Sequence, residues 1–350
     1  MERKDHKPLS EQMKDHSNAP IKNTKEYDGN TELMISTGST LLDLAISGGR
    51  VRGGGIPGGI MVEIFGPSGS GKTVLLCEIA GNVQRQGGEI KFHDPESRLN
   101  KQFAQLFGLK IEDKDYSRPD TVTEVFQNIN NWEPTIKKGI VNGVFTDSLA
   151  ALSTDMEMEK EEGDKMGMRR AKEFSEGLRK NCRILSQKNL LMVCSNQVRV
   201  NMDAGPYGQK YITPGGEAIG FYSSLRLRAM KPEKIKRKVK VAGKEVTRVI
   251  GVVTEFEVFK SSIWKPYRTA PVTILFDYGI DAIRDNLQYI KDFKKYSTYC
   301  VGEWKLSNSM DDSIAMVEEN HWEEDLKNEV IELWETIEEK FDTERKPKQR

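Results

Sequence analysis

The chain has 350 residues, of which 37% are hydrophobic and 30% are charged, and this composition is typical of a globular protein with a sizeable core. Lys and Arg number 53, as do Asp and Glu, so no global field would attract a polyanion and nucleic-acid binding would need local basic patches. No apolar run approaches the ~18 residues of a membrane span, and the polar N-terminus lacks the apolar stretch of a signal peptide, so we expect a cytoplasmic protein without a membrane partner.

Three regions follow one another along the chain. Residues 1–32 are polar and charged without sustained periodicity, which is typical of a flexible arm. Over residues 33–285, apolar strand-like runs alternate with helical patterns, which predicts an α/β domain with a mainly parallel, twisted sheet flanked by helices. Residues 286–350 predict a small C-terminal α+β unit that ends in a basic tail. Its acidic helix has apolar residues at helical spacing, at Leu326, Val330, Leu333, Ile337 and Phe341.

The α/β region contains five short apolar runs that predict strands, at residues 60–65, 89–93, 141–146, 190–195 and 225–229. A long helix is predicted over residues 166–187, with an apolar face formed by Ala171, Phe174, Leu178, Ile184 and Leu185. The four cysteines, Cys77, Cys182, Cys194 and Cys300, have neither CxxC nor zinc-site spacing, so we expect free thiols.

A phosphate-binding loop follows the first of these strands. The pattern G-x-x-x-x-G-K-[ST] is matched in full by Gly66, Pro67, Ser68, Gly69, Ser70, Gly71, Lys72 and Thr73. Glycines let consecutive N–H groups turn towards phosphate oxygens, next to the positive end of the following helix. Lys72 is then expected to reach the β- and γ-phosphates, and the Thr73 hydroxyl to bind Mg²⁺. The loop therefore predicts ATP and Mg²⁺ as cofactors.

Acidic residues end two other strands. Asp147 follows a buried strand beside the loop, where a carboxylate can bind Mg²⁺, although such residues also cap turns. Asp94 and Glu96 follow the strand at 89–93, and we assign Glu96 as the group that activates the attacking water. The alternative for Glu96 is an ordinary acid in an exposed loop. His93 is expected to be structural.

A hairpin is predicted at residues 231–260, where apolar and charged residues alternate on both sides of Ala242, Gly243 and Lys244. It is rich in basic residues, namely Lys231, Lys234, Lys236, Arg237, Lys238, Lys240, Lys244 and Arg248. Two explanations remain open, because edge strands carry Lys to resist pairing and basic surfaces also contact DNA.

The order and spacing of these motifs resemble bacterial RecA recombinases. The resemblance covers residues 33–285 and continues weakly to about residue 341. It is carried by residues 35–43, 62–73, 94–96, 117–121, 146–152, 195–199, 214–218 and 221–227. It implies a RecA-like P-loop ATPase core and a protein of homologous recombination. Such a protein would form a helical filament on single-stranded DNA, pair it with double-stranded DNA, exchange strands, and hydrolyse ATP to ADP and phosphate in a DNA-dependent reaction.

The resemblance also assigns roles to individual residues. Lys72, Thr73 and Asp147 match the family's Mg²⁺–ATP ligands, and Glu96 matches its water-activating glutamate. Gln197 matches the glutamine that senses the γ-phosphate. The remaining matches are Phe103 with an aromatic that stacks on adenine, Phe221 with an aromatic at the subunit interface, and Lys260 with a lysine that reaches the neighbour's ATP.

Two long, glycine-containing segments, 156–170 and 200–216, match the family's DNA-binding loops, although ordinary solvated loops would look similar. The candidate DNA-binding residues in and beside them are Met166, Arg169, Arg170, Arg199, Lys210, Gly215 and Gly216. The Arg and Lys side chains can neutralise phosphates, and Met166 is expected to insert between bases.

The sequence departs from the family pattern at three places. Residues 1–32 lack the family's amphipathic helix, Ser262 stands where a second interface lysine is expected, with Lys265 nearby, and the tail is basic instead of acidic. These departures leave filament assembly, and its need for single-strand-binding or loader proteins, open. Two alternatives to a recombinase are a RecA-like ATPase that acts as a regulator or mediator without strand exchange, and a ring helicase.

Overall fold

The computed structural model describes residues 33–154, 166–200, 211–212, 214, 216–343 and 345. For residues 166–171, 199–200, 211–212 and 216 it describes the backbone alone. The described residues form two compact units, which meet in the chain between Ala282 and Ile283.

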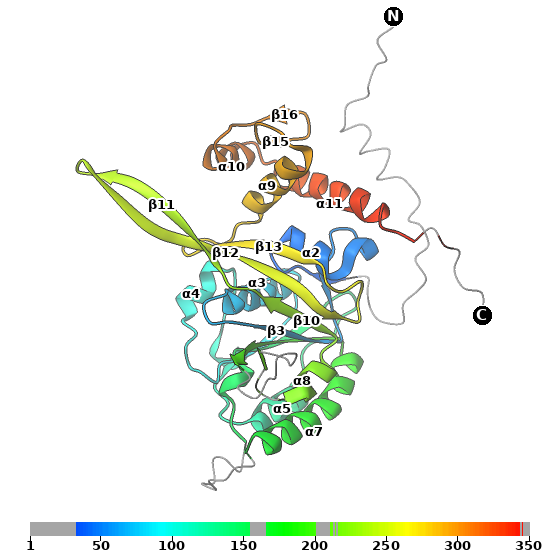
Figure 1. The fold of residues 1–350 in the computed structure, drawn as a ribbon. Helices are drawn as coiled ribbons and strands as arrows, with labels where there is room; N and C mark the ends of the chain where they lie inside the picture. Colours follow the sequence, from blue (N-terminus) through cyan, green and yellow to red (C-terminus); the bar gives the residue numbers. More distant parts are fainter. Residues whose placement is uncertain are drawn as a thin grey trace, which may run out of the picture. The chain divides into compact units, whose positions relative to one another are not determined.

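The first unit is built on a sheet with the strand order β14-β13-β12-β10-β3-β7-β6-β4-β5 (Figure 1). Its parallel part consists of β10 (Leu225–Ala229), β3 (Met61–Gly66), β7 (Leu190–Gln197), β6 (Asn142–Thr146), β4 (Ile90–His93) and β5 (Tyr116–Ser117). Every residue of β3 and β6 is buried, because helices cover both faces of a parallel sheet and make its strands continuously apolar. The predicted α/β class is confirmed, as are the five predicted strands.

The other part of the sheet is antiparallel. It contains β12 (Lys244–Ser261), which pairs with β10, and then β13 (Thr269–Leu275) and β14 (Gly279–Ile280). β11 (Glu233–Val241) pairs with the first part of β12, so the predicted hairpin is confirmed, and it extends beyond the sheet in Figure 1. β13 and β14 were not among the predicted strands.

Helices cover the sheet on both sides. They are α2 (Thr40–Ser47), α3 (Lys72–Arg85), α4 (Lys101–Leu106), α5 (Val122–Asn131), α7 (Met166–Gln187) and α8 (Gly216–Tyr222). α7 has the predicted bounds. Side chains cap the helix starts: Ser39 accepts a hydrogen bond from the Leu42 N–H, and Thr121 accepts one from the Glu124 N–H. None of the described helices is long and apolar enough to cross a membrane.

Shorter elements connect these parts. They are β1 (Met34–Ile35), which pairs with β2 (Ile56–Pro57), β8 (Arg199–Val200), which pairs with β9 (Tyr211–Ile212), and the 3-10 turns at Gly48–Arg50, Asp113–Asp115 and Leu149–Ala151.

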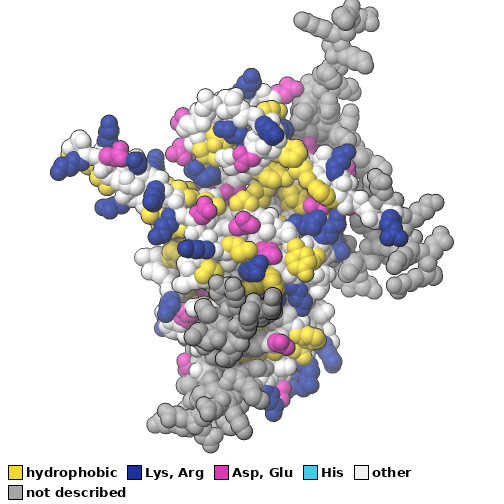
Figure 2. Space-filling model, in the orientation of Figure 1, with side chains coloured by type: hydrophobic (Ala, Val, Ile, Leu, Met, Phe, Trp, Pro, Cys, Tyr) yellow, Lys and Arg dark blue, Asp and Glu magenta, His cyan; other side chains and the backbone are white. Residues whose placement is uncertain are grey.

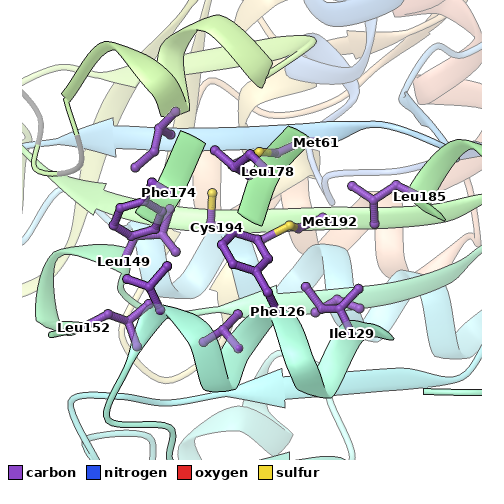
Figure 3. Close-up of a cluster of buried hydrophobic side chains, with 14 of the residues drawn as sticks. Met61, Phe126, Ile129, Leu149, Leu152, Phe174, Leu178, Leu185, Met192 and Cys194 are labelled. Carbon is purple, nitrogen blue, oxygen red and sulfur yellow. The ribbon is translucent and has the colours of Figure 1, made fainter. Parts of the chain in front are cut away.

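One apolar core lies between the sheet and helices α5 and α7 (Figure 3). The rings of Phe126 and Phe174 meet edge to face, with centroids 6.5 Å apart. A Cβ atom at Gly177 would lie 2.2 Å from the Phe126 ring, so a glycine is needed where the two helices approach. Cys77 and Cys194 are buried free thiols and Cys182 is partly buried, as the cysteine spacing predicted.

Glu78 of α3 is expected to make the stability of this unit depend on pH. Burial raises the pKa of its carboxyl from 4.5 to about 7, against opposing effects from the Ile280 N–H and Arg85. Between pH 4.5 and about pH 7, the Glu78 carboxyl is therefore protonated in the folded state and ionised in the unfolded chain. We expect up to about 3 kcal/mol of stability to be present below pH 4.5 and lost as the pH rises through 7.

Glu78→Gln should remove this loss of stability at high pH, because the amide of glutamine remains neutral. Urea unfolding at about pH 5 and pH 8 would measure it, with the exposed Glu112→Gln as the control. If Glu78→Gln and the unmodified chain differ in their free energy of unfolding by the same amount at both pH values, Glu78 is not the source of the pH dependence.

The second unit contains α9 (Ala282–Lys294) except for its first residue, followed by β15 (Cys300–Val301), β16 (Trp304–Lys305), α10 (Met310–Glu319) and α11 (Glu323–Glu339). Glu329 of α11 accepts hydrogen bonds from Lys294 at 2.5 Å and from the Gly302 N–H at 2.8 Å, which ties the helix to α9 and the β15–β16 turn. The prediction that Phe341 continues the helix was wrong. The N–H groups of Lys340 and Phe341 bond to carbonyls three residues earlier, which tightens and ends the helix, and Phe341 is 73% exposed.

Candidate active site

The phosphate-binding loop joins β3 to α3. Gly69 and Gly71 have φ angles of 74° and 82°, in the left-handed region that glycine adopts without strain. At Gly71 a Cβ atom would also lie 2.3 Å from Ile274 Cδ1. The loop therefore keeps its backbone N–H groups at the positive end of α3, which is an arrangement that binds anions.

Lys72 lies under this loop at the first position of α3. Its ammonium donates to the carbonyls of Gly66 at 3.1 Å and Pro67 at 2.7 Å. Burial lowers the pKa of Lys72, and the carboxylates of Asp147 and Glu96 oppose that shift. A cation is thus held within the loop, next to two acids.

Asp147 is held between α3 and two strands of the sheet. The Thr73 hydroxyl donates to Oδ2 at 2.6 Å, and the Ser195 hydroxyl donates to Oδ1. Burial raises the pKa of Asp147, while the bonds from Ser195 and Thr73 lower it. A carboxylate and a hydroxyl are ligands that Mg²⁺ prefers, and Mg²⁺ completes its octahedron with waters and phosphate oxygens. The residues present therefore fit a nucleotide with Mg²⁺.

Glu96 lies beside this pair, after the end of β4. Its Oε1 accepts from the Ser148 hydroxyl at 2.8 Å and from Gln197 Nε2 at 3.5 Å, while its Oε2 pairs with Arg98 at 2.6 Å. The predicted residues Glu96, Asp147 and Gln197 thus come together at the carboxyl ends of neighbouring parallel strands. No role was predicted for Ser148, although its position next to Asp147 could have indicated one.

Two other polar groups at the end of β4 are buried. Asp94 is buried and accepts from the Leu99 N–H at 2.8 Å and the Tyr116 hydroxyl at 2.7 Å. His93 is also buried, and burial with the charge of Lys91 lowers its pKa to about 4, so the ring is neutral near pH 7, as a structural histidine requires.

Phe103 lies on α4 with 37% of its surface exposed, and its ring meets Phe107 edge to face at 4.6 Å. An accessible face is compatible with base stacking, and the contact with adenine stays a prediction.

Lys260 and Phe221, both predicted to contact a neighbouring subunit, lie together. The Lys260 ammonium donates to the carbonyls of Gly220 at 2.8 Å and Phe221 at 2.9 Å, and the Phe221 ring is 76% exposed. Lys265, the nearby candidate for a second cation, lies 5.0 Å from the centroid of the Trp264 ring.

The structure describes the predicted DNA-binding residues only in part. Lys210 and Gly215 lie outside the described residues. For Met166, Arg169, Arg170, Arg199 and Gly216 the backbone alone is described: the first three begin α7, Arg199 begins β8, and Gly216 begins α8. Their side-chain contacts stay predictions.

A buried ion pair behind the loop was not predicted from the sequence. Glu63 of β3 is fully buried and accepts from Arg226 Nε at 2.6 Å and from Asn196 Nδ2 at 2.9 Å. An acid within an apolar strand is the signal that could have indicated it, because buried carboxylates require partners.

A family model described as the RecA N-terminal domain matches residues 7–281 of this chain. The chain belongs to the RecA family. Protein RecA of Thermus thermophilus is 34% identical over 304 residues, which cover 85% of both chains. Protein RecA of Anaplasma marginale is 31% identical over 315 residues, covering 89% of this chain and 82% of that one. Protein RecA of Borrelia hermsii is 33% identical over 304 residues, covering 85% and 81%.

Membership of the RecA family makes this a DNA recombination protein of the strand-exchange type. RecA proteins are in general DNA-dependent ATPases that use Mg²⁺, bind DNA and form filaments. None of the comparisons favours a regulator without strand exchange.

Proposed function

We propose that this chain binds ATP with Mg²⁺, assembles as a helical filament on single-stranded DNA, and uses that filament to pair and exchange strands with double-stranded DNA. The observation that supports this best is the convergence of Glu96, Asp147 and Gln197 beside the phosphate loop, with Gln197 placed where β7 leads into the candidate DNA-binding segment.

Each group of this site has a distinct role in the proposed hydrolysis. When bound, ATP supplies the phosphoryl group and Mg²⁺ offsets its charge. Lys72 and the loop N–H groups hold the phosphates, and Thr73 with Asp147 holds the metal ion. Glu96 accepts a proton from the attacking water, and the Ser148 hydroxyl fixes the orientation of its carboxylate.

Other residues link the site to its surroundings. Phe103 stacks on adenine, and Gln197 senses the γ-phosphate through its contact with Glu96. Phe221 and Lys260 form the contact with the next subunit, where Lys260 places its charge in the neighbour's ATP site. A single cation is expected there, because Ser262 is neutral.

Electron microscopy with single-stranded DNA, Mg²⁺ and a non-hydrolysable ATP analogue tests this proposal. We expect helical filaments when nucleotide is present and none without it. Closed rings would contradict the filament and favour a ring motor, whereas DNA-independent binding of nucleotide without assembly would favour a regulator.

We propose further that the β11–β12 hairpin contacts the double-stranded DNA. Residues 231–248 carry eight basic and two acidic side chains, and Figure 2 shows Lys and Arg along the hairpin. Arg237 lies directly opposite Arg248 in the strand register. Like charges in that position destabilise a sheet, and protection of an edge does not require them on both strands. A polyanion would offset this repulsion.

Replacing Lys236, Arg237 and Arg248 with threonine should weaken duplex binding and reduce its salt dependence. The slope of log K against log salt is negative, and each lost phosphate contact should make it less steep by about 0.9. Threonine preserves the strands. The affinity for single-stranded DNA should instead respond to replacement of Arg169 and Arg199.

Titrations of both DNA forms over a salt series would measure these slopes. The control removes the same amount of charge elsewhere on the surface of the ATPase unit. It replaces three exposed lysines with threonine, at Lys110, Lys137 and Lys138. An unchanged duplex slope in the hairpin variant would leave edge protection as the explanation for its charge.

A further inference from the structure

A row of polar side chains crosses the sheet behind the phosphate loop. Lys260 of β12, Arg226 of β10 and Glu63 of β3 are successive partners in the strand register. Asn196 of β7 is the partner of Phe65, and therefore lies diagonal to Glu63 on the same face. The row thus joins the strand that leads into the loop to the strand that ends at Gln197.

The centre of the row is a buried charge. Glu63 is fully buried, and its two carboxylate oxygens accept one hydrogen bond each from Arg226 and Asn196. The Arg226 guanidinium lies 4.6 Å from the centroid of the Phe65 ring and 5.4 Å from that of Phe259. Because the carboxylate is shielded from solvent, water could not readily replace a bond lost from it.

Both ends of the row hold the segment that contains α8. At one end, Asn196 Nδ2 also donates to the Pro214 carbonyl at 3.0 Å, shortly before α8 begins. At the other end, Lys260 donates to the carbonyls of Gly220 and Phe221 in the last turn of the helix. A Cβ atom at Gly220 would lie 3.0 Å from an Arg226 nitrogen, so this arginine packs closely under the helix.

Asn196 is the member of the row next to the nucleotide site. Its Oδ1 accepts from the Gln197 N–H at 3.0 Å, and the Gln197 side chain contacts Glu96. The Asn196 amide nitrogen is shared between the Glu63 carboxylate and the Pro214 carbonyl. A shift of the backbone at Gln197 therefore changes the bonds that hold the start of α8.

We propose that Asn196 is a positioning residue that couples nucleotide binding to the position of α8, and through α8 to the contact made by Phe221 and Lys260 with the next subunit. This inference rests on the proposed filament function, and it names the buried polar row as the physical connection. Coupling requires an element on which both sites act, and the Asn196 side chain is bonded both to Gln197 and to the segment that begins α8.

The test compares Asn196→Ala with Asn142→Ala in the full chain. Asn142 of β6 is a matched control, because it is equally buried, accepts from the Glu89 N–H and donates to the Thr135 carbonyl, but lies outside the row. Hydrogen exchange of the amides at residues 216–222 would be followed with and without single-stranded DNA, Mg²⁺ and a non-hydrolysable ATP analogue.

We expect these amides to gain about tenfold or more protection on nucleotide addition in the unmodified chain and in Asn142→Ala. In Asn196→Ala the gain should fall below about twofold, while the affinity for the analogue remains within about threefold. An undiminished gain in Asn196→Ala would overturn the inference.

A double substitution separates loss of the donor from loss of a polar side chain. Glu63→Gln with Asn196→Asp restores a hydrogen bond between the two positions and conserves net charge, but places a carboxylate oxygen against the Pro214 carbonyl in place of its donor. The nucleotide-dependent protection should therefore remain lost, although a polar side chain again fills position 196. Recovery of that protection would overturn the inference. If the unmodified chain forms no filament and its amides at residues 216–222 gain no protection, the proposed function itself fails. If all variants form filaments and gain the same protection, only the coupling through Asn196 is refuted.

Discussion

Lys72→Ala should abolish ATP binding, with at least a hundredfold loss of affinity. The ammonium lies within the phosphate loop, where it donates to the Gly66 and Pro67 carbonyls, and no other described cation is bonded there. Its loss leaves phosphate charge uncompensated in a partly desolvated site, where electrostatic interactions are strong. DNA binding that depends on nucleotide should disappear with it.

The measurement is a titration with a fluorescent ATP analogue, together with thermal unfolding. A ligand at a hundred times its Kd stabilises a protein by about 2.7 kcal/mol, and this stabilisation should be absent in the variant. Lys188→Ala is the control, since the Lys188 ammonium also donates to a backbone carbonyl, that of Trp132, but lies away from the loop. Unchanged nucleotide affinity in Lys72→Ala would refute the phosphate site.

Glu96→Gln should bind Mg²⁺–ATP and DNA normally and lose about a hundredfold or more of its hydrolysis rate. The amide preserves the shape of the side chain and can still accept the hydrogen bond from the Ser148 hydroxyl. It cannot accept a proton from the attacking water, and general base catalysis of this kind contributes about 10²–10⁴-fold. Filaments of this variant should therefore persist in ATP.

Single-turnover hydrolysis with single-stranded DNA would measure the loss. The substitution also removes the ion pair with Arg98, so Arg98→Gln serves as the control, because it breaks the pair and keeps the carboxylate. Arg98 is largely exposed, and such pairs contribute at most about 1 kcal/mol. A normal rate in Glu96→Gln would leave Glu96 as an ordinary loop acid.

The parts of the site that could be predicted from sequence are local. The phosphate loop lies within residues 66–73, and its glycines, lysine and threonine are recognisable because their spacing reflects one backbone conformation. Asp147 and Glu96 could be assigned because acids at the carboxyl ends of parallel strands gather at one edge of the sheet. The strands themselves were recognisable because burial on both faces makes them continuously apolar.

The identity of the residues that meet across distant segments had no such signal. Gln197 bonds to Glu96 across 101 residues of sequence, and the Ser148 hydroxyl that orients Glu96 comes from 52 residues away. Spacing along the chain does not encode such contacts, because they depend on which strands become neighbours.

The sequence by itself therefore determined the α/β class, the nucleotide site and the family resemblance, since these depend on short patterns and their order. Only the tertiary structure decided how β13 and β14 extend the antiparallel part of the sheet, and how the buried row behind the loop is paired. Glu63 meets Arg226 over a separation of 163 residues and Asn196 over one of 133. Strand order and register set both pairings, and register follows from burial across the whole sheet, because a slip of one residue would turn every side chain to the opposite face.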